Sequence, residues 1–264
     1  DLAGTLGGGS GDGQPDRVVV NATDGEDAIN VQGDAEVVKV SGLSSTVAVL
    51  HPEVANDRLE INTLDGRDAV DSSGLAAGAI QLFVDGGAGD DTIAGAQGIE
   101  TLLGGDGNDS LDGNGGNDRA LLGAGDDTFV WDPGDGSDTI EGEAGSDTMR
   151  FNGANIAEQV DLSANGNRLR FFRTQANITM DTAGVERVDF NALGGADVVI
   201  VGDLTGTDVG SVNLDLASTL GGAEGDGQID RVIAEGTNGG DRIHVNADAS
   251  GVVVAGLRAV VAIR

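Results

Sequence analysis

The chain has 264 residues, including 46 glycines, six phenylalanines, one tryptophan and no tyrosine, which argues against a conventional globular core and favours thin coils of small and β-branched residues. A formal net charge of −31 makes nucleic acid and anionic membrane surfaces poor partners and divalent cations good ones. The absence of cysteine excludes disulfides, thiol nucleophiles and thiolate metal sites, and no apolar run reaches the ~20 residues of a membrane-spanning helix.

Strands are expected first in the segment before residue 85, where apolar residues alternate with polar ones or run together. The segments with this pattern are Arg17–Asn21, Ala28–Val31, Glu36–Ser41, Thr46–Leu50, Arg58–Asn62 and Ala79–Val84. The turns between them include Gly25-Glu26-Asp27 and Gly66-Arg67-Asp68, whose aspartates follow Asp16 and Asp57 by eleven residues. These isolated aspartates are either secondary ligands for a divalent cation or ordinary turn caps.

A Gly-Gly-x-Gly-x-Asp pattern recurs about every nine residues from Gly86 to Arg150, and a polar-apolar-polar triplet follows it each time. The sixth place holds an acidic residue in all seven turns: Asp91, Glu100, Asp109, Asp118, Asp127, Asp138 and Asp147. Each triplet is expected to be a short strand whose middle residue faces the core: Ile93, Leu102, Leu111, Ala120, Phe129, Ile140 and Met149.

Two such nonapeptides complete one coil, so turns eighteen residues apart are expected to stack at about 4.8 Å on the same edge. This stacking places Asp91, Asp109 and Asp127 on one edge and Glu100, Asp118 and Asp138 on the other. The glycines permit tight turns that aim carbonyl oxygens inward. Two carboxylates and several carbonyls then form an all-oxygen cage of about six or more ligands, which suits calcium better than magnesium.

The nonapeptide run resembles the RTX, or hemolysin-type, calcium-binding β-roll of bacterial proteins exported by type I secretion. The resemblance implies a right-handed parallel β-roll that crosses the secretion channel unfolded and folds outside the cell on several calcium ions. Carried over by position, it implies these metal ligands: Gly86, Ala88, Gly89, Asp91, Glu100, Gly104, Asp106, Gly107, Asp109, Gly113, Gly115, Asp118, Ala124, Asp127, Asp135, Asp138 and Asp147. Departures from the pattern at Ala96, Asn114, Leu122 and Glu143 put some of the sites in doubt.

The nonapeptide register stops after Phe151, and further strands are expected at Val160–Leu162, Arg168–Phe172, Ile178–Met180, Val185–Phe190 and Val198–Val201, with a tight turn at Asn165-Gly166.

The basic cluster of Arg168, Arg170 and Arg173 either binds an acidic polysaccharide or makes salt bridges on a strand face. Trp131 either packs in the core or stacks on a sugar. A rank of threonines at the seventh place is too irregular to favour ice binding. No nucleophile stands beside either histidine, so we expect no hydrolase triad and no enzyme.

A long-range repeat relates the two ends of the chain. Residues 1–50 align without a gap to residues 215–264, and the segment Gly11-Asp12-Gly13-Gln14 returns as Gly225-Asp226-Gly227-Gln228. This alignment favours a piece cut from a tandem array, and the absence of an initiator methionine and of a signal peptide agrees with it. The alternative is an internal duplication in which both ends act as similar caps.

The sequence therefore predicts an all-β, right-handed parallel β-roll or β-solenoid in four segments: coils at 1–85, the calcium β-roll at 86–150, a strand-rich continuation at 151–214, and the start of a second copy at 215–264. The predicted function is that of a calcium-binding, calcium-folded structural segment of a large secreted or cell-surface bacterial protein, as a scaffold, spacer or adhesin repeat. The main alternative is a secretion and folding module of an exported enzyme or toxin. Expected partners are calcium, neighbouring repeats or itself head-to-tail, and cell-surface polysaccharide, without nucleic acid or membrane insertion.

Overall fold

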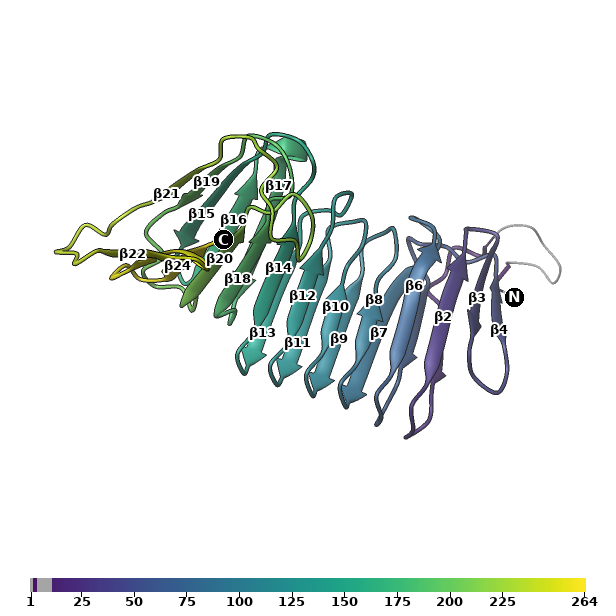
Figure 1. Cartoon of the computed structure of the whole chain (residues 1–264). Coiled ribbons are helices and arrows are strands. Elements are labelled where there is room, and N and C mark those ends of the chain that lie inside the picture. Colours follow the sequence, from purple (N-terminus) through teal and green to yellow (C-terminus); the bar gives the residue numbers. More distant parts are fainter. Residues whose placement is uncertain (1, 4–10) are drawn as a thin grey trace. The chain divides into compact units, whose positions relative to one another are not determined.

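A computed structural model of the chain describes residues 2–3 and 11–264. Within this part of the chain the regular structure is β, apart from one short 3-10 turn, η1 (Gln175–Asn177). The chain divides into two compact units (Figure 1). The first comprises the residues up to Phe129 together with Gly134–Asp138, and the second comprises Val130–Pro133 and Thr139–Arg264. The division into four segments remains a prediction from the sequence.

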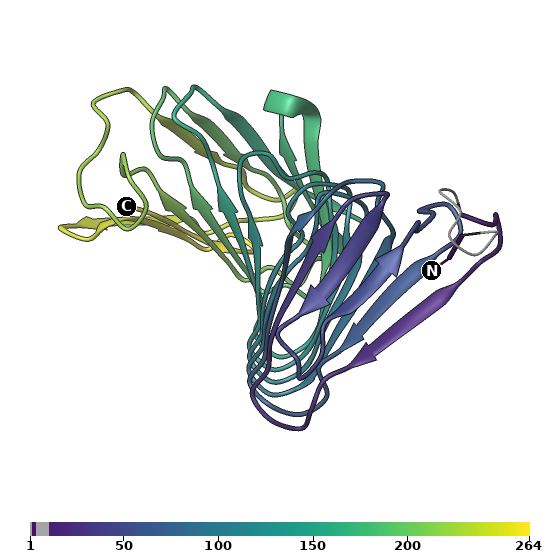
Figure 2. The same cartoon turned by 90° about the vertical axis from the view of Figure 1, so that its right-hand side faces the viewer.

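The first unit is a stack of coils in which each turn of the chain adds one strand to each of two sheets (Figure 2). Its first sheet is parallel, with the strand order β1 (Arg17–Asn21), β5 (Arg58–Asn62), β7 (Gln81–Ala88), β9 (Thr101–Asp106) and β11 (Arg119–Ala124). In the nonapeptide run, Thr101 pairs with Arg119 in register, which confirms the predicted coil of two nonapeptides.

The second sheet of this unit has the order β4 (Val47–Leu50), β3 (Val37–Ser41), β2 (Ala28–Gly33), β6 (Ala69–Leu75), β8 (Thr92–Ala94) and β10 (Ser110–Asp112). Strands β2, β6, β8 and β10 are parallel, whereas β2, β3 and β4 form an antiparallel meander at the N-terminal end. The next strand, β12 (Thr128–Trp131), crosses the boundary between the units. The parallel β-solenoid is therefore correct for the coils, and the meander is an addition that alternating patterns do not reveal.

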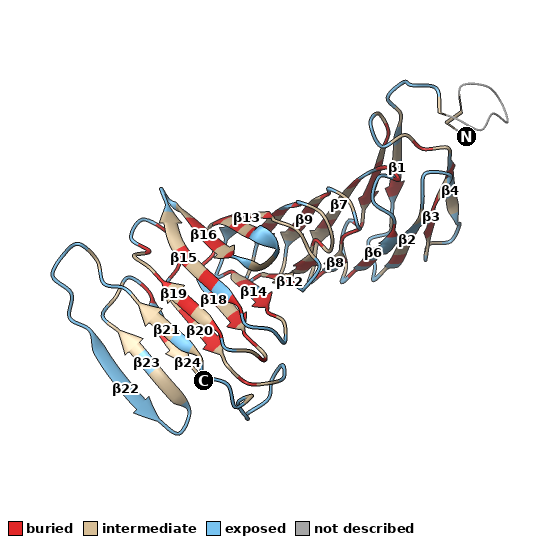
Figure 3. Ribbon diagram, turned by 90° about the horizontal axis from the view of Figure 1, so that it is seen from above, coloured by how far each residue is buried: buried red, intermediate tan, exposed pale blue. Residues whose placement is uncertain are grey.

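The core lies between the two sheets, and buried residues alternate with more exposed ones along most of the strands (Figure 3). All seven residues predicted to face inward are at most 1% exposed: Ile93, Leu102, Leu111, Ala120, Phe129, Ile140 and Met149. A strand of three residues can bury only one side chain, so each nonapeptide contributes a thin slice to the apolar interior of its unit.

The second unit repeats the two-sheet arrangement with longer coils. Its first sheet has the order β13 (Thr139–Ala144), β17 (Ile178–Ala183), β16 (Arg168–Arg173), β15 (Gln159–Asn165), β19 (Val198–Val201) and β21 (Arg231–Ala234). Its second sheet has the order β14 (Thr148–Asn152), β18 (Arg187–Asn191), β20 (Ser211–Asp215), β24 (Val260–Ile263), β23 (Gly251–Ala255) and β22 (His244–Asp248).

Two antiparallel insertions interrupt the parallel coils of this unit, one at β15–β16–β17 and one at β22–β23–β24. The predicted turn after Asn165 is confirmed, because Asn165 pairs with Arg168 across it. Gly166 takes φ +69° there, which suits the first central position of a tight hairpin. Trp131 is buried and stacks on Phe151 with 3.9 Å between the ring centroids, so of the two alternatives it packs in the core.

Candidate calcium site

The acidic turns of the nonapeptide run stack in two ladders, one on each edge of the first unit. On one edge the backbone N–H of Asp91 donates to Oδ1 of Asp109 at 2.8 Å, and the N–H of Asp109 donates to Oδ1 of Asp127 at 2.7 Å. On the other edge Glu100 donates in the same way to Asp118 at 2.7 Å. The structure therefore brings together the predicted carboxylates, and one oxygen of each anchors the coil before it.

The second ladder tolerates the two extra residues that precede its last member. The N–H of Asp118 donates to Oδ1 of Asp138 at 2.8 Å, across a separation of 20 residues instead of 18. The loop after β12 absorbs the insertion. Asp135, the other predicted ligand of this loop, is half-buried.

The second carboxylate oxygen of several ladder aspartates is buried without a hydrogen bond. Oδ2 is in this state in Asp91, Asp109, Asp118 and Asp138, and these residues are at most 3% exposed. A buried charged oxygen without a donor is costly unless a cation or a proton compensates it. The arrangement therefore has the donor chemistry of a cation site.

Glycines at the first place keep space open beside these oxygens. A Cβ atom added to Gly104 would lie 2.5 Å from Oδ2 of Asp109, and one added to Gly113 would lie 2.6 Å from Oδ2 of Asp118. A Cβ atom on Gly86 would lie 2.7 Å from Oδ2 of Asp91. Any larger residue at these three positions would fill the space between the carboxylate oxygen and the main chain of the turn.

Main-chain carbonyls supply further oxygens along the same edge. The N–H groups of Gly66, Gly89 and Gly107 donate to the carbonyls of the next third-place residues: Ala88 at 2.8 Å, Asp106 at 2.7 Å and Ala124 at 2.8 Å. Each carbonyl keeps a second lone pair. No group of three or more His, Asp or Glu side chains in the described part of the chain could hold a metal by itself, so these carbonyls must complete any cage.

The remaining predicted ligands have different surroundings. Gly115 donates its N–H to the carbonyl of Ala96 at 3.1 Å, so its turn stacks as expected. The N–H of Asp147, in the second unit, donates to Oε2 of Glu186 at 2.8 Å. Oε2 of Glu100 accepts the N–H of Ala96 at 3.1 Å, and this longer side chain therefore folds back onto its own turn.

Two of the departures from the glycine pattern preserve the turn. Asn114 and Glu143 adopt the left-handed conformation of the glycines that they replace, with φ of 55° and 69°. Asparagine tolerates this conformation readily, whereas glutamate does so at a cost. Leu122 replaces a first-place glycine and is fully buried. Its side chain packs in the core at a place where the neighbouring turns have a glycine and therefore no side chain.

Burial raises the pKa of the ladder carboxyls. The pKa of Asp91 rises from 3.8 to about 7 and that of Asp109 to about 6, in each case mainly through loss of solvent and secondarily through neighbouring carboxylates. Burial likewise raises the pKa of Glu100 and of Asp118. Without a cation, the ionised ladders therefore oppose folding at neutral pH.

Acid is expected to replace calcium in part. Because the folded state raises these pKa values, it binds protons more tightly than the unfolded chain between the ordinary pKa of 3.8 and about 7. The stability of the calcium-free chain should increase as the pH falls from 8 to 5, and it should be lost as the pH rises through the folded pKa values. Far-UV circular dichroism of the chain in EGTA at several pH values measures the folded fraction, and a folded fraction that is independent of pH would contradict the prediction.

The ladders extend beyond the nonapeptides. The N–H of Asp68 donates to Oδ1 of Asp91 at 2.8 Å, and the N–H of Asp27 donates to Oδ1 of Asp68 at 2.7 Å. In the second unit, the N–H of Glu158 donates to Oδ1 of Asp197 at 2.7 Å. Sequence reasoning missed Asp197, although the signal was present in Gly194-Gly195-Ala196-Asp197 immediately before a predicted strand.

The basic cluster of the second unit is engaged in ion pairs. The three guanidinium groups pair with carboxylates: Arg168 with Glu141 and Asp181, Arg170 with Asp161, and Arg173 with Glu158. The Arg173 and Glu158 side chains are only 6% and 0% exposed. The salt-bridge interpretation of the cluster therefore agrees with the structure. The buried carboxylate of Glu158 is compensated by the guanidinium of Arg173.

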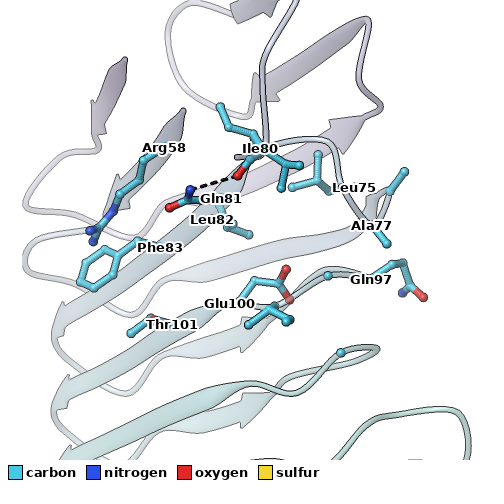
Figure 4. A pocket seen from close by; sticks show the side chains of 16 residues that line it. Arg58, Leu75, Ala77, Ile80, Gln81, Leu82, Phe83, Gln97, Glu100 and Thr101 are labelled. Atoms are coloured by element: carbon cyan, nitrogen blue, oxygen red, sulfur yellow. Dashed lines mark hydrogen bonds between the residues drawn. The ribbon is translucent and has the colours of Figure 1, made fainter. Parts of the chain in front are cut away.

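A hollow of about 620 Å³ opens on the first unit beside Glu100 (Figure 4). Arg58 lies 4.4 Å from the centroid of the Phe83 ring in this hollow, and Nε2 of Gln81 donates to the carbonyl of Val54 at 3.0 Å. The rest of the lining is mostly apolar, and Glu100 is its single carboxylate. We assign no ligand to this hollow, because no set of polar groups converges in it.

Stacked parallel coils with buried carboxylates at glycine-rich turns define a β-roll with calcium-site chemistry. The RTX calcium-binding nonapeptide repeat is the family whose model matches the chain, in four copies over residues 83–99, 94–129 and 134–155. These residues are therefore RTX calcium-binding repeats. None of the curated proteins compared with the chain matches it. In the described residues, no helix is long and apolar enough to cross a membrane.

Proposed function

We propose that this chain is a calcium-folded structural segment of a large secreted or cell-surface bacterial protein, in which it serves as a stiff spacer or scaffold. The observation that carries the proposal is the pair of ladders in which Oδ2 of Asp91, Asp109, Asp118 and Asp138 is buried without a hydrogen bond. The tandem relation between residues 1–50 and 215–264 supports a repeat in a longer array over a terminal secretion module.

The residues that would hold calcium are the sixth-place carboxylates with the carbonyls of the stacked turns. On the first edge these are Asp91, Asp109 and Asp127 with the carbonyls of Ala88, Asp106 and Ala124. Calcium would supply the positive charge that the buried oxygens lack, and several oxygens at flexible distances suit its coordination. With a dissociation constant of about 0.1 mM, calcium at about 2 mM would stabilise each site by roughly 1.8 kcal/mol.

The chain is expected to be expanded in EGTA and compact in calcium. An unfolded chain of this length has a radius of gyration of about 57 Å, and folding should reduce it to roughly half or less. Small-angle X-ray scattering of the full chain in EGTA, in 2 mM magnesium and in 2 mM calcium (about the extracellular level) tests this. A chain that is already compact in EGTA would contradict calcium-driven folding, and magnesium-driven compaction would contradict the selectivity.

A further inference from the structure

In their described residues the two copies of the 50-residue segment fold alike, although they lie in different units. The antiparallel bridge between Ala3 and Gly11 recurs between Ala217 and Gly225. The N–H of Leu2 donates to the carbonyl of Leu50 at 3.0 Å, and the equivalent bond joins Leu216 and Arg264 at 3.1 Å. Strands β1, β2, β3 and β4 correspond to β21, β22, β23 and β24.

The two copies pair with the rest of the fold through opposite edges. In the N-terminal copy, β1 pairs with β5 and β2 pairs with β6, both of which follow it in the chain. In the C-terminal copy, β21 pairs with β19 and β24 pairs with β20, both of which precede it. The edges used in one copy are the edges left unused in the other, as far as the described strands show.

The C-terminal copy consequently exposes residues that the N-terminal copy buries. Ile29 and Val31 of β2 are 3% and 0% exposed, whereas the equivalent Ile243 and Val245 are 48% and 65% exposed. All five residues of β22 are exposed (Figure 3). Ile243 lies immediately before β22 and Val245 lies within it, at the edge of the sheet that β22 leaves unpaired. Exposed apolar residues at such an edge are typical of an interaction surface.

The hydrogen bonds made in the N-terminal copy indicate which segment should cover the exposed edge of the C-terminal copy. The N–H of Asp16 donates to Oδ1 of Asp57 at 3.1 Å, and Nε of Arg17 donates to Oε1 of Glu60 at 2.7 Å. The equivalent Asp230 accepts the N–H of Asp197 at 3.0 Å, so the carboxylate ladder reaches Asp230 from the preceding coil. The coil that holds Asp57 and Glu60 offers the next acceptors.

We infer that the edge formed by β21 and β22 is covered by a second copy of the β5–β6 coil, so that adjacent repeats of 214 residues wind as one uninterrupted solenoid. Each 50-residue segment then pairs with the preceding repeat through one edge and with the following repeat through the other. The inference rests on the proposed role as a repeat segment but not on calcium as the folding signal. Such an array is rigid across each junction, because no linker separates the repeats.

The test extends the full chain with a second copy of residues 51–129 after Arg264 and measures how fast single cysteines react with a thiol reagent. The chain has no native cysteine, so each label is unique. In the unextended chain, Val245→Cys should react quickly and Val31→Cys slowly. In the extended chain, labelling of Val245→Cys should slow by about tenfold or more, as local opening becomes unfavourable.

Two controls make the result specific. Val253 corresponds to Lys39, which is exposed in the covered copy, so Val253→Cys should react equally fast with and without the extension. An extension of equal length made from residues 136–214 should leave the labelling of Val245→Cys fast.

Three outcomes would overturn the inference: fast labelling of Val245→Cys in the extended chain, equal slowing by both extensions, or slowing in the unextended chain as its concentration rises. The last would mean that a second free chain covers the edge. Protection of Val31→Cys in the matching extended and unextended chains reports the fold independently. If Val31→Cys stays protected while Val245→Cys remains fast, only the continuous winding fails and the calcium-folded segment stands.

Discussion

The full chain carrying Asp109→Ala is expected to need several-fold more calcium to fold. Asp109 stands between Asp91 and Asp127 in the ladder, so its removal affects two stacked gaps. With roughly 1.8 kcal/mol from each site at 2 mM calcium, the loss should be about 3 to 4 kcal/mol. The same substitution also leaves the N–H of Asp91 without its acceptor, which adds about 1 kcal/mol or more. Urea unfolding at fixed calcium concentrations measures the sum.

Asp109→Asn separates the two roles of this residue. Asparagine keeps an oxygen for the N–H of Asp91 but removes the negative charge that burial opposes, since the pKa of Asp109 is raised to about 6. This variant should be as stable as the native chain or more stable in EGTA at pH 7, and it should be less stable in 2 mM calcium. The exposed Asp24→Asn makes the same change in net charge and should alter neither value by more than about 0.5 kcal/mol. An unchanged calcium midpoint in Asp109→Asn would remove Asp109 from the ligand set.

Arg173→Met is expected to destabilise the second unit by about 3 to 5 kcal/mol, since it leaves a buried carboxylate without its cation. Nε of Arg173 donates to Oε1 of Glu158 at 2.6 Å, and the Glu158 side chain is fully buried. The guanidinium also lies 5.5 Å from the centroid of the Trp131 ring. Urea unfolding in saturating calcium, followed by Trp131 fluorescence, measures the loss.

The double variant Arg173→Met with Glu158→Gln should recover most of that loss, because no buried charge remains. Arg187→Met is the matched control: Arg187 pairs with Asp189 on the surface, with 49% of its side chain exposed, and the cost should stay below about 1 kcal/mol. A double variant as unstable as Arg173→Met alone would mean that packing against Trp131, and not charge, explains the effect.

The nonapeptide run was predictable from sequence because its period determines both the core residue and the stacking partner. One inward residue per triplet and two triplets per coil leave a single arrangement that buries Ile93, Leu111 and Phe129 together. The structure confirms the core residues and the stacked carboxylates. That the carboxylates bind calcium remains a prediction for each individual residue.

The antiparallel insertions could not be predicted in the same way. Alternation of apolar residues predicts a strand but does not indicate the direction of its neighbour. The sequences of β3 and β16 are therefore compatible with parallel and with antiparallel pairing. Strand β6 is absent from the sequence prediction because Ser72, although fully buried, breaks its apolar pattern. The Arg173–Glu158 pair is created by the β15–β16 hairpin, which joins residues 15 positions apart through three-dimensional pairing.

Far-UV circular dichroism of the full chain during a calcium titration tests the central claim most directly, with magnesium as the control ion. The account predicts a disordered spectrum in EGTA at pH 7.5 and a cooperative rise of β signal at sub-millimolar to millimolar calcium, with no comparable response to magnesium. A β spectrum that is complete in EGTA and unchanged by calcium would contradict it, because the buried carboxylates would then need no cation for the chain to fold.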